Sequence, residues 1–195
     1  MANGGFVNYQ SFKYPEEIRD LVRSSNHNIS GLLKNDTYTH FVESVDDRIM
    51  KNLIDIQEEL FPGDVYDEKK LNYIFNNSKD VSILTVDLGD DLIGCSLSHD
   101  DGSLGKGAYL CDGLAVRKAY QGRGLGSALM KLGMVFTNRL GYDGLFLFSS
   151  DNNRSFFDRL GFRQQKEKSS PGKFAMYKEI DDQYVTKTIK TFKSQ

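Results

Sequence analysis

Three glycines on alternate positions, Gly122, Gly124 and Gly126, stand between a short apolar run and an amphipathic stretch. The apolar run, Leu114–Val116, is typical of a buried strand, and the stretch after the glycines has helical spacing. A glycine-rich turn entering a helix leaves backbone N–H groups unpaired and has no Cβ to keep a ligand away. The helix dipole adds about half a positive charge there. These features predict a phosphate or pyrophosphate site, to which Arg123 would add a cation.

Two other phosphate-binding turns fit these residues less well. A P-loop requires Lys followed by Ser or Thr after its last glycine, whereas Ser127 follows Gly126 directly. The dinucleotide fingerprint G-x-G-x-x-G/A fits Gly122 and Gly124, but Ser127 stands where the third Gly or Ala belongs. This partial fit keeps a nucleotide-binding regulatory domain as one alternative. A turn that only shapes a strand-to-helix connection is the structural alternative.

The residues fit a third pattern better. Gln121-x-x-Gly124-x-Gly126, preceded by LAVRKAY, closely resembles the acyl-CoA pyrophosphate loop (Q/R-x-x-G-x-G/A) of the GNAT superfamily of N-acetyltransferases. FFDRLGF, at 156–162, resembles that family's second signature, F-Y-x-x-x-G-F. The two motifs also have the expected separation, with one helix and one strand between them. By element order the resemblance covers residues 38–180, and it implies an α/β (α+β) domain with a mixed, mostly antiparallel central sheet flanked by helices on both faces.

The resemblance also implies a reaction, in which an acetyl group passes from acetyl-CoA to a primary amine of a small molecule or peptide by direct attack on the thioester. No metal is implied. A backbone N–H of the strand before the turn would bind the oxyanion. The residues expected to bind CoA are Leu114, Ala115 and Val116 on the strand, Gln121, Gly122, Arg123, Gly124, Leu125, Gly126 and Ser127 around the turn, and Asn153 and Phe157 around the second motif.

Asp112 is the candidate general base, because the resembled family often places a carboxylate facing the cleft on this strand. Strand alternation would set Asp112 on one face with Leu110, Leu114 and Val116 unless a bulge intervenes. Gly113 marks either a bulge or a close ligand approach. Between apolar neighbours the Asp112 carboxyl would be partly desolvated, which raises its pKa. A purely structural hydrogen bond from Asp112 to a loop is the equal alternative.

Phe157 departs from the family pattern, in which this position is commonly a Tyr thought to protonate the leaving sulfur. Tyr142, Tyr109, Tyr177 or water are the candidate substitutes. A thiolate with a free pKa of about 8.5 also tolerates a missing acid. The departure leaves open a second function, a non-catalytic acyl-CoA-binding sensor or regulatory module.

Length and composition describe one globular domain. The chain has 195 residues, enough to bury a core, and its net charge of −2 makes no case for a nucleic-acid partner. No apolar run approaches the roughly 20 residues of a membrane helix, and MANGGFVNYQ lacks the features of a signal peptide. Cys95 and Cys111 lack metal-ligand spacing and are expected to be free buried thiols. We therefore expect a cytoplasmic protein without membrane or nucleic-acid partners; a homodimer stays open.

The apolar spacing predicts the elements that must position these residues. An N-terminal extension, 1–37, should hold one short helix after Pro15 and then a loop, and the tail, 181–195, should extend the sheet or stay disordered. Asp46 or Asp47 and then Asp67 are expected to cap two helices. The expected strands are 38–45, 81–88, 91–98, 108–116 and 145–148 with a hairpin near the end of the domain, and the helices around the motifs are 125–140 and 153–160.

Three residues after the strand 91–98 are weak functional candidates. Asp100 and Asp101 fit a solvated loop best, although they would also suit a cationic acceptor. His99 is a weak catalytic candidate, and a surface histidine is the favoured interpretation.

Overall fold

The computed structural model describes residues 14, 16–33, 37–43, 45–63, 66–100, 102–104, 107–170 and 172–193. Over these residues seven strands form one sheet, in the order β1-β2-β3-β4-β5-β7-β6. The strands are β1 (Tyr38–Phe41), β2 (Asp80–Leu88), β3 (Asp91–Asp100), β4 (Ala108–Val116), β5 (Gly144–Ser149), β6 (Arg163–Ser170) and β7 (Lys173–Glu179). The helices are α1 (Glu16–Leu33), α2 (Asp47–Leu60), α3 (Glu68–Asn77), α4 (Leu125–Arg139), α5 (Asp151–Arg159) and α6 (Asp182–Lys193), with a 3-10 turn, η1 (Lys118–Tyr120).

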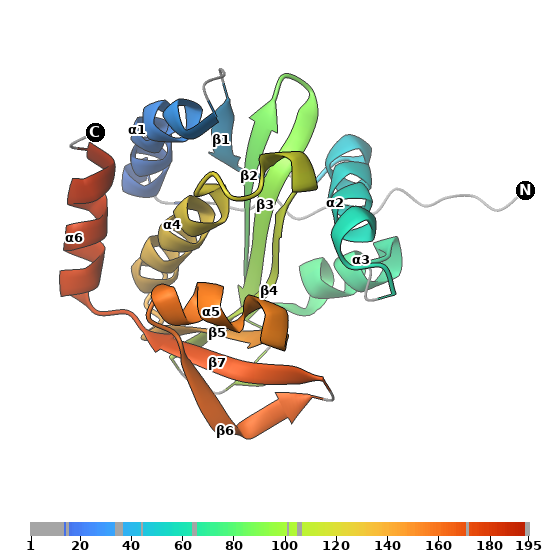
Figure 1. Ribbon diagram of the computed structural model, residues 1–195, viewed down its shortest axis with the longest axis vertical. Coiled ribbons are helices and arrows are strands. Elements are labelled where there is room, and N and C mark those ends of the chain that lie inside the picture. Colours follow the sequence, from blue (N-terminus) through green and yellow to red (C-terminus); the bar gives the residue numbers. More distant parts are fainter. Residues whose placement is uncertain are drawn as a thin grey trace, which may run out of the picture.

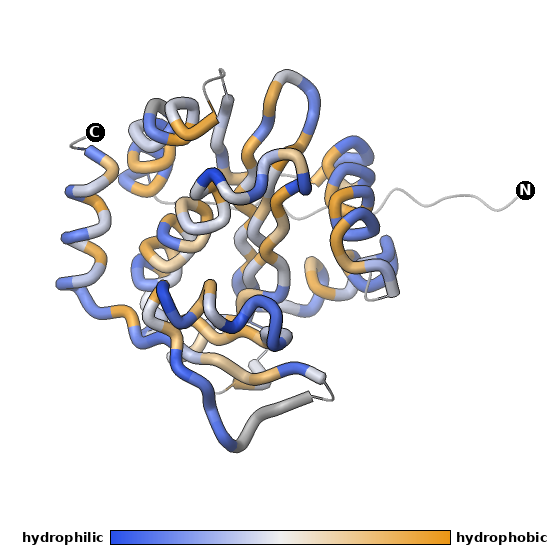
Figure 2. Tube along the Cα trace, viewed as in Figure 1, coloured by the Kyte–Doolittle hydropathy of each residue, from blue (hydrophilic) through white to orange (hydrophobic). Residues whose placement is uncertain are grey.

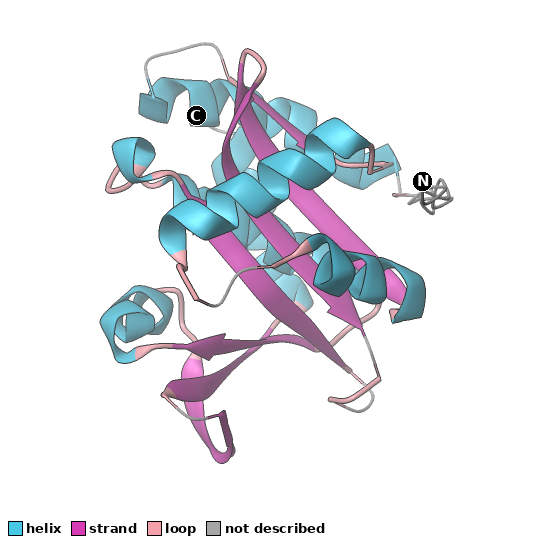
Figure 3. Cartoon of the chain, turned by 90° about the vertical axis from the view of Figure 1, so that its right-hand side faces the viewer, coloured by secondary structure: helices cyan, strands magenta, loops and turns pink. Residues whose placement is uncertain are grey.

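Helices cover both faces of the sheet, as the resemblance implied (Figure 1). Helices α1, α4 and α6 lie on one face, and α2 and α3 lie on the other, where they stand in front of the strands in Figure 3. Strands β4 and β5 pair in parallel, and the other described strand pairs are antiparallel. The described helices include none that is long and apolar enough to cross a membrane.

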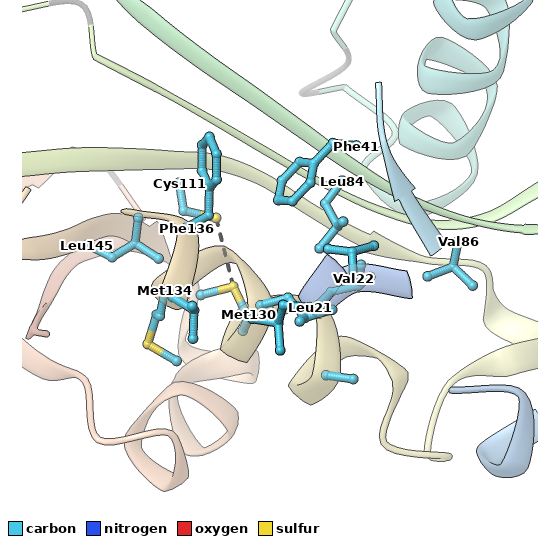
Figure 4. Packing of buried hydrophobic residues seen from close by; sticks show 14 of the residues in the cluster. Leu21, Val22, Phe41, Leu84, Val86, Cys111, Met130, Met134, Phe136 and Leu145 are labelled. Atoms are coloured by element: carbon cyan, nitrogen blue, oxygen red, sulfur yellow. Dashed lines mark hydrogen bonds between the residues drawn. The ribbon is translucent and has the colours of Figure 1, made fainter. Parts of the chain in front are cut away.

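Apolar side chains fill the space on each side of the sheet (Figure 2). On the α4 face, the rings of Phe41 and Phe136 pack at a tilt of 40° near Leu84, and the Cys111 thiol lies 3.9 Å from the Met130 sulfur (Figure 4). A second cluster lies under α2 and α3 and contains Cys95. Both cysteines are buried and free, as predicted.

The predicted caps of α2 and α3 are confirmed. The Asp46 side chain accepts a hydrogen bond from the Ile49 amide at 2.8 Å, and Asp67 accepts one from the Lys70 amide at 2.7 Å. Each carboxylate satisfies an N–H that has no partner within its helix and lies at the positive end of the helix dipole. These caps fix where the two helices begin over the sheet.

The prediction of a loop after the first helix is wrong, because α1 continues to Leu33. Ile29 and Leu33 are buried against the sheet. The polar residues that suggested a loop are bonded instead: Ser25 Oγ donates to the Val22 carbonyl at 2.8 Å, and Asn28 Nδ2 donates to the Phe192 carbonyl at 2.7 Å. Tertiary burial and these bonds outweigh the weak local helix propensity.

The prediction for the tail is also wrong, since residues 182–193 form α6. Val185, Thr188 and Phe192 are buried at helical spacing, and α6 packs against α1 and α4. The Asp181 side chain accepts a hydrogen bond from the Tyr184 amide at 2.6 Å and so caps the helix. The predictions for MANGGFVNYQ and for Asp101 lie outside the described residues.

The burial of α1 has a measurable consequence. We expect Ile29→Ala to lower the free energy of unfolding by about 2–5 kcal/mol, because it empties a site in the core. Leu32, which is 42% exposed on the same helix, is the control: Leu32→Ala should cost about 0.5 kcal/mol or less. Urea denaturation measures both, and equal losses would contradict the packing of α1 on the sheet.

Candidate active site

The connection between β4 and α4 contains the glycine turn, and we call the backbone amides of residues 122–127 the amide ring. Gly122 and Gly124 have φ values of +75° and +89°, in the left-handed region that favours glycine, and Gly124 is the N-cap of α4. The Gly124 carbonyl accepts the first helical hydrogen bond, from the Ala128 amide at 3.0 Å. Over the described part of the chain, the amides of residues 122–127 have no hydrogen-bond acceptor. These unpaired N–H groups lie at the N-terminus of α4, which is the positive end of its dipole.

Three side chains hold this turn against α2 and the sheet. Glu59, on α2, accepts hydrogen bonds from Arg117 Nη1 at 2.7 Å and from the Lys118 amide at 2.9 Å. The Lys118 amide, followed by Arg117, holds the pKa of the Glu59 carboxyl below its usual range. Arg117 Nε also donates to the Leu92 carbonyl at 2.7 Å, and Gln121 Nε2 donates to the Val116 carbonyl at 2.8 Å.

A cavity of about 560 Å³ opens in front of the amides. We call it the larger cavity. Of the residues predicted to bind CoA, those that line it are Leu114, Val116, Gln121, Gly122, Gly124, Leu125, Gly126, Ser127, Asn153 and Phe157. Its other lining residues are Leu60, Phe61, Tyr120, Phe156 and Arg159.

Two of the predicted residues turn away from this cavity. The Ala115 side chain is buried in the cluster under α2 and α3. Arg123 is exposed, donates from Nη2 to the Ala119 carbonyl at 3.2 Å and lies 5.7 Å from the centre of the Tyr120 ring. The Arg123 guanidinium therefore stands beside the turn, and Arg123 does not line the larger cavity.

A smaller cavity, of about 150 Å³, lies at the other end of the same opening. Its polar lining comes from α2, α3, β4, β5 and β7, and includes Asp112, Gln57, Tyr66, Lys70 and Lys173. The two cavities share the lining residues Phe61, Leu114, Asn153 and Phe157. They therefore meet at one junction.

A bulge in β4 creates this junction. Leu97 of β3 pairs with Gly113 and Ser98 pairs with Cys111, so Asp112 is the extra residue. The bulge that Gly113 indicated as one possibility is confirmed. Regular alternation therefore does not hold here, and Leu114 and Val116 share the α4 face with Cys111 rather than a face with Asp112. The pairing of β4 with β5 also ends at Cys111. The second half of β4 therefore borders the cavities on the side where β5 would continue.

Asp112 sits on the bulge with its side chain 25% exposed. Burial raises the pKa of its carboxyl, but His99, Tyr66 and the charge of Lys70 outweigh burial and hold the pKa below its usual range. The predicted rise in pKa is therefore wrong, because polar neighbours surround a carboxyl that the strand pattern placed among apolar ones. The Tyr66 hydroxyl also donates to the Asp112 carbonyl at 2.6 Å.

Comparisons with known proteins agree with this geometry. A profile described as the Acetyltransferase (GNAT) family matches residues 48–162, which is more than half of the chain. The chain belongs to the GNAT acetyltransferase family. The match spans the bulged strand, the glycine turn and the second motif. No curated protein sequence matches the chain.

Solved structures share the GNAT fold. A putative GNAT-family acetyltransferase from Desulfovibrio desulfuricans has 19% identity and a TM-score of 0.60, covering 73% of this chain and 99% of its own. PaiA N-acetyltransferase from Thermoplasma acidophilum, solved with coenzyme A, has 16% identity and a TM-score of 0.57, covering 72% and 98%. Arabidopsis thaliana Naa50, solved with the bisubstrate analogue CoA-Ac-MVNAL, has 18% identity and a TM-score of 0.57, covering 72% and 98%.

His99 is not a surface residue in this GNAT domain. Its side chain is 5% exposed, and its Nε2 lies 3.5 Å from Asp112 Oδ2, which is a close electrostatic contact but long for a hydrogen bond. The surface interpretation is therefore wrong. His99 is buried because β3 runs two residues further than predicted, to Asp100, and so carries His99 into the sheet.

The tyrosines suggested as substitutes for the missing acid lie outside both cavities. The Tyr142 hydroxyl shares its one hydrogen between Asp80, at 2.6 Å, and Asp100, at 2.8 Å, and burial followed by these carboxylates raises its pKa strongly. Asp100 is therefore committed to this contact. Tyr109 is fully buried and donates to the Ser98 carbonyl at 3.0 Å. Tyr177 packs its ring over Gly144, on β5.

Sequence reasoning missed several residues that line the two cavities. Phe156 and Arg159 lie within the FFDRLGF segment, so the second motif contained the signal for them. Gln57, Tyr66 and Lys70 carry no sequence signal, because they reach the site only when α2 and α3 fold over β4. The described residues contain no group of three or more His, Cys, Asp or Glu side chains placed to hold a metal ion.

Proposed function

We propose that this protein transfers an acetyl group from acetyl-CoA to the primary amine of a small molecule or peptide. The observation that carries the proposal is the junction between the two cavities. The larger cavity, with its ring of amides, is suited to the donor, and the smaller one, beside Asp112, is suited to the acceptor. An amine and a thioester that enter from opposite ends would meet at Leu114 and Phe157.

The donor side fits a CoA pyrophosphate. The amides of residues 122–127 offer N–H groups at a helix N-terminus, and Gly122 and Gly124 bring the backbone close without a Cβ in the way. Arg159 adds a guanidinium to the lining. The open second half of β4 offers backbone groups to an extended pantetheine arm and to the oxyanion that forms during attack.

The acceptor side needs a group that takes a proton. An amine must be neutral to attack the thioester carbon. As the C–N bond forms and the C–S bond breaks, the attacking nitrogen must also lose one of its N–H protons. Asp112 is ionised at neutral pH because its pKa is low, and it lines the smaller cavity. We assign it the role of general base. Holding both substrates at the junction supplies the other part of the rate gain.

Phe157 favours a second candidate function, a non-catalytic acyl-CoA sensor. The ring lies at the junction, packed edge-to-face on Phe156 and Phe162, and it offers no proton to a leaving sulfur. A sensor would bind acetyl-CoA in the larger cavity without turnover. Turnover of acetyl-CoA with a panel of primary amines separates the two functions.

The amide ring predicts a difference between two glycines that flank α4. Gly124 and Gly141 have nearly equal φ values, +89° and +87°. A Cβ on Gly124 would lie in ordinary van der Waals contact with the Leu32 side chain, at 3.6 Å, and a Cβ on Gly141 would meet nothing within 4 Å, so neither substitution clashes. Substitution by Ala should therefore cost about 1–2 kcal/mol of stability at each. We expect only Gly124→Ala to lose about tenfold or more in CoA affinity, as one charge-assisted hydrogen bond is worth about 1.5–3 kcal/mol. Calorimetric titration with CoA measures this, and equal affinities would remove the ring from the site.

Asp112→Asn tests the general base. We expect kcat to fall by about 10²–10⁴-fold while the CoA dissociation constant changes little, because Asn keeps the shape of Asp but takes no proton. Asp87 is the control, since it also contacts a histidine, at 3.3 Å, and lines neither cavity. Steady-state kinetics with the fastest amine of the panel makes the measurement. A near-normal rate in Asp112→Asn would assign Asp112 to structure.

Phe157→Tyr tests whether the thiolate leaves unassisted. We expect a change in turnover of no more than a few fold, since a general acid contributes about 10²–10⁴-fold only where protonation limits the rate. Steady-state kinetics measures the turnover. A CoA titration should accompany it, because a hydroxyl buried at the junction without a partner would weaken CoA binding. A large gain in acetyl transfer would mean that the natural chain has lost an acid it needed, and would favour the sensor.

A further inference from the structure

The lining of the smaller cavity carries more positive than negative charge. Lys70 reaches it from α3 and Lys173 from the start of β7, whereas Asp112 is the one carboxylate among the described residues that line it. Lysine carries an ammonium at neutral pH, and Asp112 is ionised there because its pKa is low. Two cations therefore face one anion in the space that we assign to the acceptor.

Lys70 is placed to bind an anion at the mouth of this cavity, where the lining is exposed. Its Nζ lies 4.0 Å from the centre of the Tyr66 ring, which holds the ammonium over one wall. Over the described residues, Lys70 forms no ion pair with a carboxylate. Tyr66 also donates to the Asp112 carbonyl at 2.6 Å, so one side chain positions both the ammonium and the bulge that carries the base.

A buried amide on α2 indicates that the cavity takes a polar ligand. Gln57 is 4% exposed and lines the cavity, and its side-chain amide forms no hydrogen bond with another of the described residues. A Cβ on Gly113 would lie 3.1 Å from Gln57 Nε2, which places the amide beside the bulge. Buried polar groups in folded proteins almost always have a hydrogen-bond partner, so we expect a bound ligand to provide one.

We propose that the acceptor is a primary amine that carries a carboxylate, as a free amino acid does or a peptide that begins with an acidic residue. This inference rests on the proposed function, because it concerns the acceptor of the same reaction. The amine lies at the junction beside Asp112. The carboxylate lies toward Lys70 and Lys173, and the Gln57 amide donates to it. The cavity volume of about 150 Å³ is below the about 300–1,000 Å³ of sites for drug-sized ligands, and so suits a group of this size.

The excess positive charge also suits the chemistry of the amine. Nearby cations lower the pKa of a bound ammonium, and the amine must be neutral to attack. A neutral amine with one carboxylate has a single negative charge, which balances the excess in the lining. A phosphate group, with a charge of about −1.5 to −2, would leave the site negative. An acceptor with a second cationic group would be repelled by both lysines.

Matched substrates that differ in one carboxylate measure this preference. Glycine with glycinamide and glutamate with glutamine are the small-molecule pairs, and a peptide that begins with Asp, against the same peptide with Asn, is the peptide pair. We expect the kcat/KM of the wild-type protein to favour the carboxylate member of at least one pair about tenfold or more. Base strength cannot produce this preference for glycine, because glycinamide is the weaker base and has more neutral amine at neutral pH. A preference confined to the peptide pair identifies a peptide acceptor, and one in a small-molecule pair identifies a free amino acid.

Reversing one charge tests the role of Lys70. We expect Lys70→Glu to lower the ratio of the two kcat/KM values within the preferred pair about tenfold, because attraction becomes repulsion. Lys69→Glu is the matched control, since Lys69 is exposed on the same helix and lines neither cavity, and it should change the ratio less than about twofold. Any effect of these changes on the pKa of Asp112 acts on both members of a pair and cancels in the ratio.

Gln57→Met keeps the length of the side chain and removes its amide, so it should lower the same ratio. Lys70 is exposed, so Lys70→Glu decides the matter even if Gln57→Met does not fold. Equal kcat/KM values within every pair, or an unchanged ratio in Lys70→Glu, overturn the acceptor class and leave acetyl transfer to amines standing. A wild-type protein that acetylates no amine of the panel and no member of these pairs overturns the proposed function, and the acceptor class with it.

Discussion

The site depends on a break in one strand ladder. Asp112 is an extra residue in β4, and pairing with β5 stops at Cys111, one residue before it. The bulge turns the Asp112 carboxylate toward the smaller cavity and leaves the second half of β4 beside an opening rather than beside a strand. A continuous ladder would close the junction where the two cavities meet. An interrupted ladder is tolerable here because α2 and α4 cover the two faces of the sheet around it, and α3 adds to the cluster under α2.

The rest of the domain fixes the two ends of this break. Glu59 and Arg117 tie the turn at the N-terminus of α4 to α2 and β3, so the amides keep a constant position relative to β4. At the other end, Tyr66 holds the backbone of the bulge, and His99 stands behind its carboxylate. Helices α1 and α6 pack on α4 from outside and support the helix that carries the amides. The chemistry we propose therefore uses backbone geometry more than side-chain reactivity.

The sequence predicted what is local and missed what is tertiary. The glycine turn, the caps of α2 and α3 and the strand β4 depend on neighbouring residues, and each was predicted. The length of α1 and the helix α6 depend on burial against distant elements, so polar composition misled the prediction there. The pKa of Asp112 moved opposite to expectation because Tyr66, Lys70 and His99 come from three other segments. No pattern along the chain places those three side chains around one carboxyl.

A crystal structure of the protein with acetyl-CoA tests the central claim most directly. The account predicts pyrophosphate oxygens within hydrogen-bond distance of the amides of residues 122–127. It also predicts the thioester carbonyl beside the backbone of Leu114–Val116, facing Asp112 across the junction. Acetyl-CoA bound with its phosphates on other residues, or a β4 that pairs with β5 along its whole length in the complex, would contradict it.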